Sequence, residues 1–260
     1  MSGAVLFDVS GSLATVTLSH PGKFNAMSRI MWRELRAAFE LIQQRHDVHC
    51  VLVQGENGHF CAGGDISEYA AFRFKEASLR DFHENDVWGG LQAMLDCDVP
   101  IVARIEGNCM GAGVEIASCC DMRLAAGNAR FGAPIAKLGF PMAPREAALV
   151  TRAVGELTAR EMLLSAAVLD AAEMKQRGFL NQVLALDALD AAMQERLQRI
   201  GQLAPQAARL NKASFRALAH VPPAQEAINI IATAYDYAPS GEHREGIIAF
   251  MEKRPPAFSA

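Results

Sequence analysis

Apolar and polar positions along the first fifty residues change from a strand pattern to a helix pattern. Residues 5–9 and 13–18 have the composition of two strands, and the tight Ser10-Gly11 turn between them predicts a β-hairpin. Residues 29–44 then carry apolar side chains at helical spacing, and Ser28 is a suitable N-cap for that helix. The chain is therefore expected to begin with a hairpin followed by an amphipathic helix.

A strand, a glycine-rich loop and a helix then occur twice in succession. Residues 50–54 (CVLVQ) are almost continuously apolar, which is typical of a strand covered on both faces, and a loop and a helical region over about 66–95 follow. Residues 101–105 (IVARI) form the second buried strand, which leads into another glycine-rich segment. This repetition predicts right-handed crossovers and an α/β core.

The rest of the chain is predicted to be mostly helical. Residues 121–125 (DMRLA) have a strand pattern with a short extension at Arg130-Phe131, and from about Arg145 onward the pattern is helical. No internal repeat or low-complexity linker interrupts the chain. We therefore expect an α/β core over residues 1–200 and a helical C-terminal region over residues 201–260.

Composition and charge exclude several classes of protein. The 260 residues are 51% hydrophobic and 21% charged, which allows a large buried core and excludes general disorder. A net charge of -4 without runs of Lys or Arg argues against a nucleic-acid partner. No apolar run is long enough to cross a membrane, and the first residues lack a secretory signal, so we expect a cytoplasmic protein. The six cysteines form no CxxC pair, as expected for reduced, buried thiols.

Residues 107–120 (GNCMGAGVEIASCC) contain one charged residue, Glu115, where average composition predicts roughly three. The glycines do not form the GxGxxG or P-loop patterns, and no metal-ligand spacing is present, so neither a cofactor nor a metal is expected. A glycine turn at a helix N-terminus exposes backbone N–H groups. Two such turns at neighbouring strand ends are able to direct two N–H groups at one oxygen, forming an oxyanion hole, whereas the alternative is tight packing of helix on strand.

The order of these segments resembles the crotonase superfamily, the enoyl-CoA hydratase/isomerase family. The resemblance covers nearly the whole chain and is carried by six segments: HPGKFNAMS (His20–Ser28), VLVQGENGHFCAGGDI (Val51–Ile66), IVARIEGNCMGAGVEIASCCDMRLA (Ile101–Ala125), FGAPIAKLGF (Phe131–Phe140), the segment Ala171–Leu184, and EGIIAFMEKRPPAF (Glu245–Phe258). It implies a crotonase-like spiral of ββα units with a helical C-terminal trimerisation region. It also implies an acyl-CoA thioester as substrate and a homotrimer or a dimer of trimers.

The resemblance also assigns site residues. The backbone N–H groups of Ala62 and Ala112 would hold the thioester oxygen, and Glu115 would act as general acid/base. Glu115 follows Ala112 by three residues, so on a helix both face one site; the alternative role for Glu115 is charge stabilisation of the helix N-terminus. Contacts to the CoA substrate are implied for Lys23, Phe24, Ala62, Gly63, Gly64, Asp65, Ile66, Ala112 and Ile135, and for Phe250 and Lys253 in a tail reaching a neighbouring subunit's ligand.

One expected carboxylate is missing. Typical hydratases of the family carry a second glutamate just after the position of Pro134, and this chain has Ile135 there. Glu146, Glu84 and His83 are candidates for a replacement, although each is also consistent with an ordinary helix residue, and His59 is expected to have a positional role. The prediction is an atypical one-glutamate enoyl-CoA hydratase-type lyase; the alternatives are a double-bond isomerase and a catalytically weak acyl-CoA-binding protein.

Overall fold

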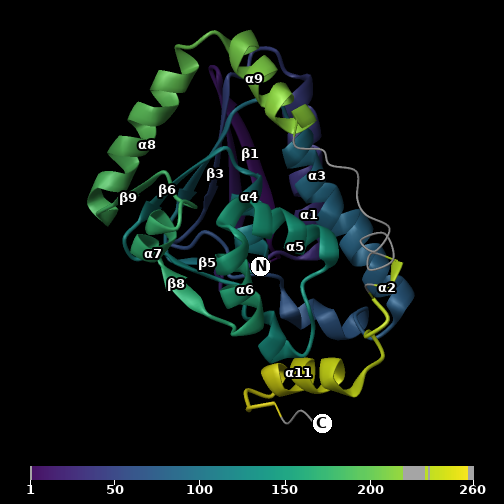
Figure 1. Ribbon diagram of the computed structural model, residues 1–260. Coiled ribbons are helices and arrows are strands. Elements are labelled where there is room, and N and C mark those ends of the chain that lie inside the picture. The colour runs from purple at the N-terminus through teal and green to yellow at the C-terminus, as the bar shows by residue number, and fades with distance from the viewer. Residues whose placement is uncertain (1, 219–231, 234, 257–260) are drawn as a thin grey trace.

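The computed structural model describes residues 2–218, 232, 233 and 235–256. Its larger sheet has six strands in the order β1 (Ala4–Ser10), β2 (Leu13–Ser19), β3 (Cys50–Gly55), β4 (Ile101–Ile105), β6 (Met122–Ala126) and β9 (Gln182–Leu184). Only β1 and β2 pair antiparallel, as the predicted hairpin; the other neighbours are parallel. A smaller sheet has the order β5 (Asn108–Met110), β7 (Arg130–Gly132) and β8 (Val168–Asp170) (Figure 1).

Helices connect and cover the two sheets. They are α1 (Arg29–Gln44), α2 (Glu76–Asp81), α3 (Trp88–Asp96), α4 (Ala112–Cys119), α5 (Pro144–Val154), α6 (Glu156–Leu164), α7 (Ala171–Gln176), α8 (Leu186–Gly201), α9 (Pro205–Leu218) and α11 (Gly241–Met251), with the shorter turns η1 (Ile66–Ala71), η2 (Phe82–Val87) and η3 (Pro134–Leu138). The predicted helix and its N-cap are confirmed, because the Ser28 hydroxyl accepts a hydrogen bond from the Met31 N–H at 3.3 Å.

The chain passes repeatedly from the larger sheet to the smaller one and then into a helix. It runs through β4, β5 and α4, and again through β6, β7, η3 and α5. This repetition is the predicted spiral of ββα units. It brings the start of α4 and the η3–α5 segment, which belong to successive turns of the spiral, to the same part of the molecule, where α4 packs against α5.

Both faces of the larger sheet are buried, which explains its apolar strands. In β3, Cys50 and Leu52 pack in the cluster that contains Leu189 and Met193 of α8. Their neighbours Val51 and Val53 pack in the main core with residues of α1. Figure 1 shows α8 on one side of the sheet and α1 and α3 on the other. The prediction of a doubly covered parallel strand is therefore confirmed.

Short elements were not recognised in the sequence. The strand β5 lies inside the predicted glycine-rich loop, and β8 and β9 interrupt the region after Arg145, so the expectation of continuous helix there is wrong. Each has three residues, too few to show a period of two. The region over 66–95 is also divided, into η1, α2, η2 and α3, with η2 in π-helical geometry.

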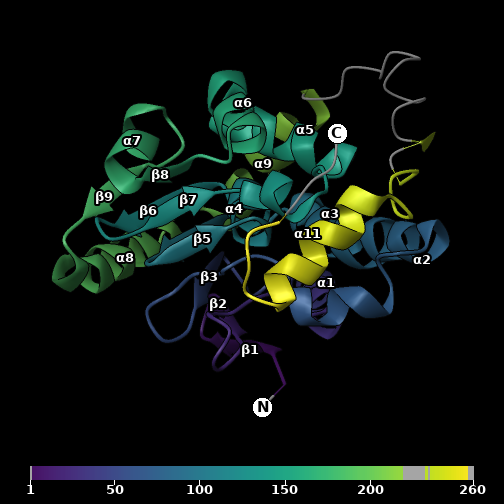
Figure 2. The same cartoon turned by 90° about the horizontal axis from the view of Figure 1, so that it is seen from below.

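The C-terminal helix packs on its own chain. α11 contacts η1 and η3 (Figure 2). The contact is close because Gly246 has no side chain: an added Cβ would lie 2.2 Å from the backbone carbonyl of Leu138. The predicted C-terminal region, residues 201–260, is described only in part, since it includes residues 219–231, 234 and 257–260. The boundary near residue 200 and a role of this region in trimerisation therefore stay predictions. No helix in the described residues is long and apolar enough to span a membrane.

Candidate functional site

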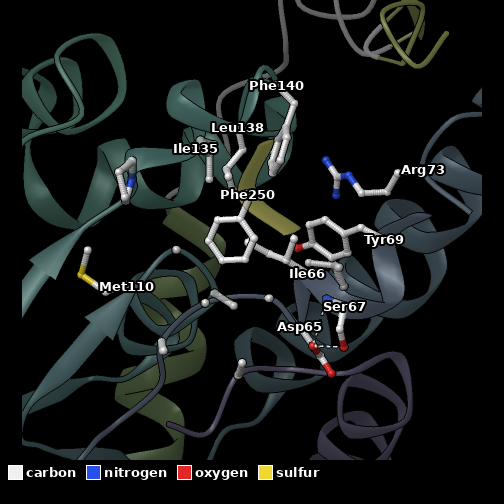
Figure 3. Close-up of a pocket in the computed structure, with 18 of the residues that line it drawn as sticks. Asp65, Ile66, Ser67, Tyr69, Arg73, Met110, Ile135, Leu138, Phe140 and Phe250 are labelled. Atoms are coloured by element: carbon white, nitrogen blue, oxygen red, sulfur yellow. Dashed lines mark hydrogen bonds between the residues drawn. The ribbon is translucent and has the colours of Figure 1, made fainter. Parts of the chain in front are cut away.

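A cavity of about 780 Å³ lies between the spiral core and α11. Its lining includes every side chain that the sequence assigned to the site: Lys23, Phe24, Ala62, Gly63, Gly64, Asp65, Ile66, Ala112, Glu115, Ile135, Phe250 and Lys253. Figure 3 shows Arg73, Tyr69 and Phe140 together on one side of this pocket and Met110 on the other. The structure thus brings the predicted residues together, whereas their roles in binding and catalysis stay predictions.

The start of α4 presents an unused backbone donor to the cavity. Gly111 has φ 47° and ψ −110°, a conformation that glycine adopts without strain, and Ala112 begins the helix directly after it. Among the described residues, the Ala112 N–H has no hydrogen-bond acceptor. This is the donor that the sequence predicted, with Glu115 one helical turn further along α4.

The other predicted donor is occupied. The Ala62 N–H donates to the carbonyl oxygen of Phe24 at 3.0 Å. Phe24 and the following Asn25 have φ values of 47° and 62°, so two successive non-glycine residues lie in the left-handed region. An oxygen bound between Ala62 and Ala112 must therefore replace the Phe24 carbonyl as acceptor, which requires a small shift of this loop.

Glu115 is a buried carboxyl group without a partner. Its side chain is 8% exposed and, within the described part of the chain, makes no hydrogen bond or ion pair. Burial raises its pKa well above the ordinary value, and a charge on Glu146 raises it further, while the charge of Arg73 acts in the opposite direction. A carboxyl group in this environment is able to hold a proton at neutral pH and to transfer it.

The loop around Asp65 is held by its own polar contacts. The Asp65 carboxylate accepts from the Ser67 N–H at 3.1 Å, which caps η1, and pairs with the Lys23 ammonium at 2.7 Å. Burial alone would raise the pKa of Asp65, but the hydrogen bonds and the charge of Lys23 lower it overall. Asp65 therefore fixes the loop that carries Ala62, and Lys23 is not a free cation.

The C-terminal residues of the predicted site lie beside the rest of it. Phe250 and Lys253 line the cavity of their own chain, and their expected contact with a neighbouring subunit's ligand stays a prediction. They lie at the cavity because α11 packs closely on η1 and η3. Ile135 lines the same cavity, so no carboxylate occupies the position of the usual second glutamate.

Three groups were candidates for the missing carboxylate, and the structure separates them. Glu146 and His83 line the cavity and are buried. Glu84 is not part of the lining; it accepts a hydrogen bond from the Tyr235 hydroxyl at 2.8 Å and pairs with Arg145 at 3.1 Å. Burial raises the pKa of Glu146 to about 8, against the lowering effect of Arg73. Sequence reasoning missed Arg73, because it lies in a segment predicted as helix, where an arginine gives no local signal that it is buried.

The sequence profile of the enoyl-CoA hydratase/isomerase family matches residues 8–260. The chain belongs to this family. It is 30% identical to a probable enoyl-CoA hydratase of Mycobacterium leprae over 98% of this chain and 97% of that protein.

Solved structures of this family have the same fold. An enoyl-CoA hydratase/carnithine racemase from Magnetospirillum magneticum aligns with a TM-score of 0.82 and 34% identity, over 99% of this chain and 96% of the other. A methylmalonyl-CoA decarboxylase in complex with 2-nitronate-propionyl-CoA aligns with a TM-score of 0.87 and 24% identity over both whole chains, and shares the fold. Within the described residues of this family member, no cluster of His, Cys, Asp and Glu is arranged to hold a metal ion.

Proposed function

We propose that this family member processes acyl-CoA thioesters by stabilising a thioester enolate, and that it is an enoyl-CoA hydratase-type lyase. The observation that supports this most directly is the start of α4. There a buried, unpaired carboxyl group, Glu115, lies one helical turn from the unused backbone N–H of Ala112, and both line one cavity. A proton-transfer group beside a donor for developing negative charge is what enolate formation requires.

In the proposed reaction the thioester oxygen accepts hydrogen bonds from Ala112 and, after displacing the Phe24 carbonyl, from Ala62. Water adds to the β carbon of a 2-enoyl thioester, and negative charge moves to the thioester oxygen. Glu115 takes part in the proton transfers that accompany this addition. Each backbone donor is worth ~10²–10³-fold in rate in comparable sites.

The cavity suits the two ends of an acyl-CoA. Its lining includes the lysines Lys23, Lys137 and Lys253, and Lys137 and Lys253 have no ion-pair partner in the described part of the chain. These ammonium groups are available to the phosphates of CoA. The lining also contains apolar side chains suited to an acyl chain, namely Phe82, Val87, Leu138, Phe140 and Met142.

An isomerase is the second candidate, because Ile135 removes the usual second glutamate and a single carboxyl group is able to move a proton between the α and γ carbons. A binding protein without catalysis is disfavoured. A carboxyl group that is buried without a partner costs stability, and a protein that only binds gains nothing from it.

A panel of 2-enoyl-, 3-enoyl- and saturated CoA esters separates these functions. Hydration removes the conjugated thioester chromophore of a 2-enoyl ester, isomerisation of a 3-enoyl ester creates it, and a binding protein changes neither. We expect Glu115→Gln to lower the hydration rate by ~10²–10⁴-fold, and Glu40→Gln, at an exposed surface pair with Arg36, to leave it unchanged. Full turnover by Glu115→Gln would refute its role.

The backbone donor needs a different variant, because no side-chain change removes an N–H group. Ala112 is the first residue of α4, the helical position at which proline is best tolerated. Ala112→Pro therefore deletes the donor and retains the helix. We expect the rate to fall by ~10²–10³-fold while the fold persists; an unchanged rate would mean that Ala112 holds no oxyanion.

A further inference from the structure

Glu146 is a buried carboxyl group in the cavity that the proposed reaction has not yet used. It lies in the first turn of α5 and is 2% exposed. Its side-chain partner in the described residues is His83, whose Nδ1 lies 3.1 Å from Oε1 of Glu146. No lysine or arginine forms an ion pair with it there. This is an uncommon environment for a glutamate whose only task is to start a helix.

The hydrogen bonds around His83 determine where its proton lies. Arg73 is a donor only, and its Nη1 lies 3.3 Å from Nε2 of His83. Nε2 must therefore be the acceptor, so the proton of the neutral ring is on Nδ1 and is donated to Glu146. Burial, assisted by the charge of Arg73, lowers the pKa of His83 well below its ordinary value, which keeps the ring neutral.

Arg73 is itself held rigidly. It is fully buried, and its guanidinium lies 3.9 Å from the ring centroid of Phe140 and 4.4 Å from that of Tyr69 (Figure 3). Its remaining hydrogen bonds go to Nε2 of His243 at 3.4 Å and to the Tyr237 hydroxyl at 3.3 Å. Because its partners are aromatic rings and neutral acceptors, the charge of Arg73 is not neutralised by an ion pair. It therefore lowers the pKa of both Glu115 and Glu146.

The local fold places His83 at the junction. It lies in the π-helical turn η2, where the wider turn changes the direction of side chains relative to the preceding α2. Its ring also stacks on Tyr235, with centroids 5.6 Å apart and planes inclined by 20°. Segments around residues 73, 83, 146 and 237–243 thus meet in one hydrogen-bonded chain that ends at Glu146.

Glu115 and Glu146 influence each other's protonation. Each is buried, and a charge on Glu146 makes a charge on Glu115 less favourable. Two such carboxyl groups avoid being ionised together, so the pair is expected to retain at least one proton, and the form with one proton between them becomes more populated as pH rises toward 8. One protonated and one ionised carboxyl group in the same cavity form an acid and a base.

We infer that Glu146, oriented by Arg73 through His83, is the second proton-transfer group of this site. The inference rests on the proposed function. In hydration, the ionised carboxyl group takes a proton from water as its oxygen bonds to the β carbon. The protonated carboxyl group delivers a proton to the α carbon as the enolate collapses. One water molecule is added, and the two carboxyl groups together neither gain nor lose a proton.

The test compares a carboxyl variant of the cavity with a variant of an exposed glutamate. We expect Glu146→Gln to lower kcat for hydration of a 2-enoyl-CoA by ~10²–10⁴-fold, with the Kd for a saturated acyl-CoA changed by no more than about threefold. Glu40→Gln, which changes an exposed glutamate outside the cavity, is the matched control and should retain kcat. Unchanged binding shows that a loss of kcat is not a loss of fold.

The orienting role of His83 has its own readout. His83→Phe removes the donor to Glu146, and His83→Gln restores an N–H donor, so we expect a loss of kcat that the glutamine variant partly recovers. Removing a donor to the ionised carboxylate should also move the pH profile of kcat to higher pH. The charged and titratable groups that face this pair are Arg73, Glu115, Glu84, Arg145, Tyr235, Tyr237 and His243.

The outcomes are distinguishable. The inference would be overturned, and the proposed function left intact, if the wild type hydrates a 2-enoyl-CoA, Glu115→Gln does not, and Glu146→Gln still does. No hydration of any enoyl-CoA by the wild type would overturn the proposed function and the inference with it. Loss in both carboxyl variants, with binding retained, supports both.

Discussion

Glu146 should make the stability of the protein depend on pH. The native protein holds a proton on this carboxyl group up to about pH 8, whereas a glutamate in an unfolded chain releases it near 4.5. Between these values the native state binds a proton that the unfolded state does not. The free energy of unfolding contributed by Glu146 therefore falls as pH rises through this window.

The size of the effect follows from the two pKa values. One proton changes the free energy of unfolding by about 1.4 kcal/mol per pH unit. From pH 5 to pH 8 the wild type should therefore lose about 3–4 kcal/mol relative to Glu146→Gln, which has a similar shape and no titratable proton. This is an upper limit, because Glu115 shares the proton and a compact unfolded state shares part of the burial.

The assay is urea unfolding of both proteins at several pH values between about 5 and 8, at one protein concentration. Glu40→Gln, at an exposed i,i+4 pair with Arg36, serves as the control and should follow the wild type. The free energy of unfolding of Glu146→Gln should rise relative to that of the wild type as the pH increases. Parallel curves for Glu146→Gln and the wild type would show that Glu146 is ionised in the native state, and the reasoning about its burial would be wrong.

Three further predictions concern other parts of the molecule. Gly246→Ala places a Cβ 2.2 Å from the Leu138 carbonyl and should displace α11, which lowers the free energy of unfolding by about 1–3 kcal/mol and raises KM. Gly241→Ala, whose added Cβ meets nothing within 4 Å, is the control and should change neither quantity. Equal effects of the two variants on urea unfolding and on KM would contradict the described packing of α11. All six cysteines are buried, and burial raises the pKa of Cys61 to about 12, so a thiol reagent should modify them only after unfolding; a rapid native reaction would disprove this. Large apolar side chains are exposed on α6 and α9, such as Leu157 and Phe215, and we expect them to be covered in a homotrimer or a dimer of trimers. A monomer mass by light scattering would refute this expectation.

The sequence alone determined the features that depend on neighbouring residues. The apolar run of β3 predicts a strand buried on both faces, and the structure supplies α8 on one face and α1 on the other. Ser28 predicts the start of α1. The spacing of Gly111, Ala112 and Glu115 predicts a turn, a donor and a carboxyl group on one helix. Such patterns are local, because strand and helix periods are complete within a few residues.

Only the tertiary structure decided which of the distant groups share the cavity. Glu84 and Glu146 are both plausible in the sequence, but Glu84 is bound to Tyr235 and Arg145, whereas Glu146 faces the cavity beside His83. The occupation of the Ala62 N–H by Phe24, 38 residues earlier, is also invisible to any local pattern. These contacts join segments far apart in the chain, and their burial sets the pKa values. The solitary Glu115 of the sequence thus becomes one of two carboxyl groups in the folded site.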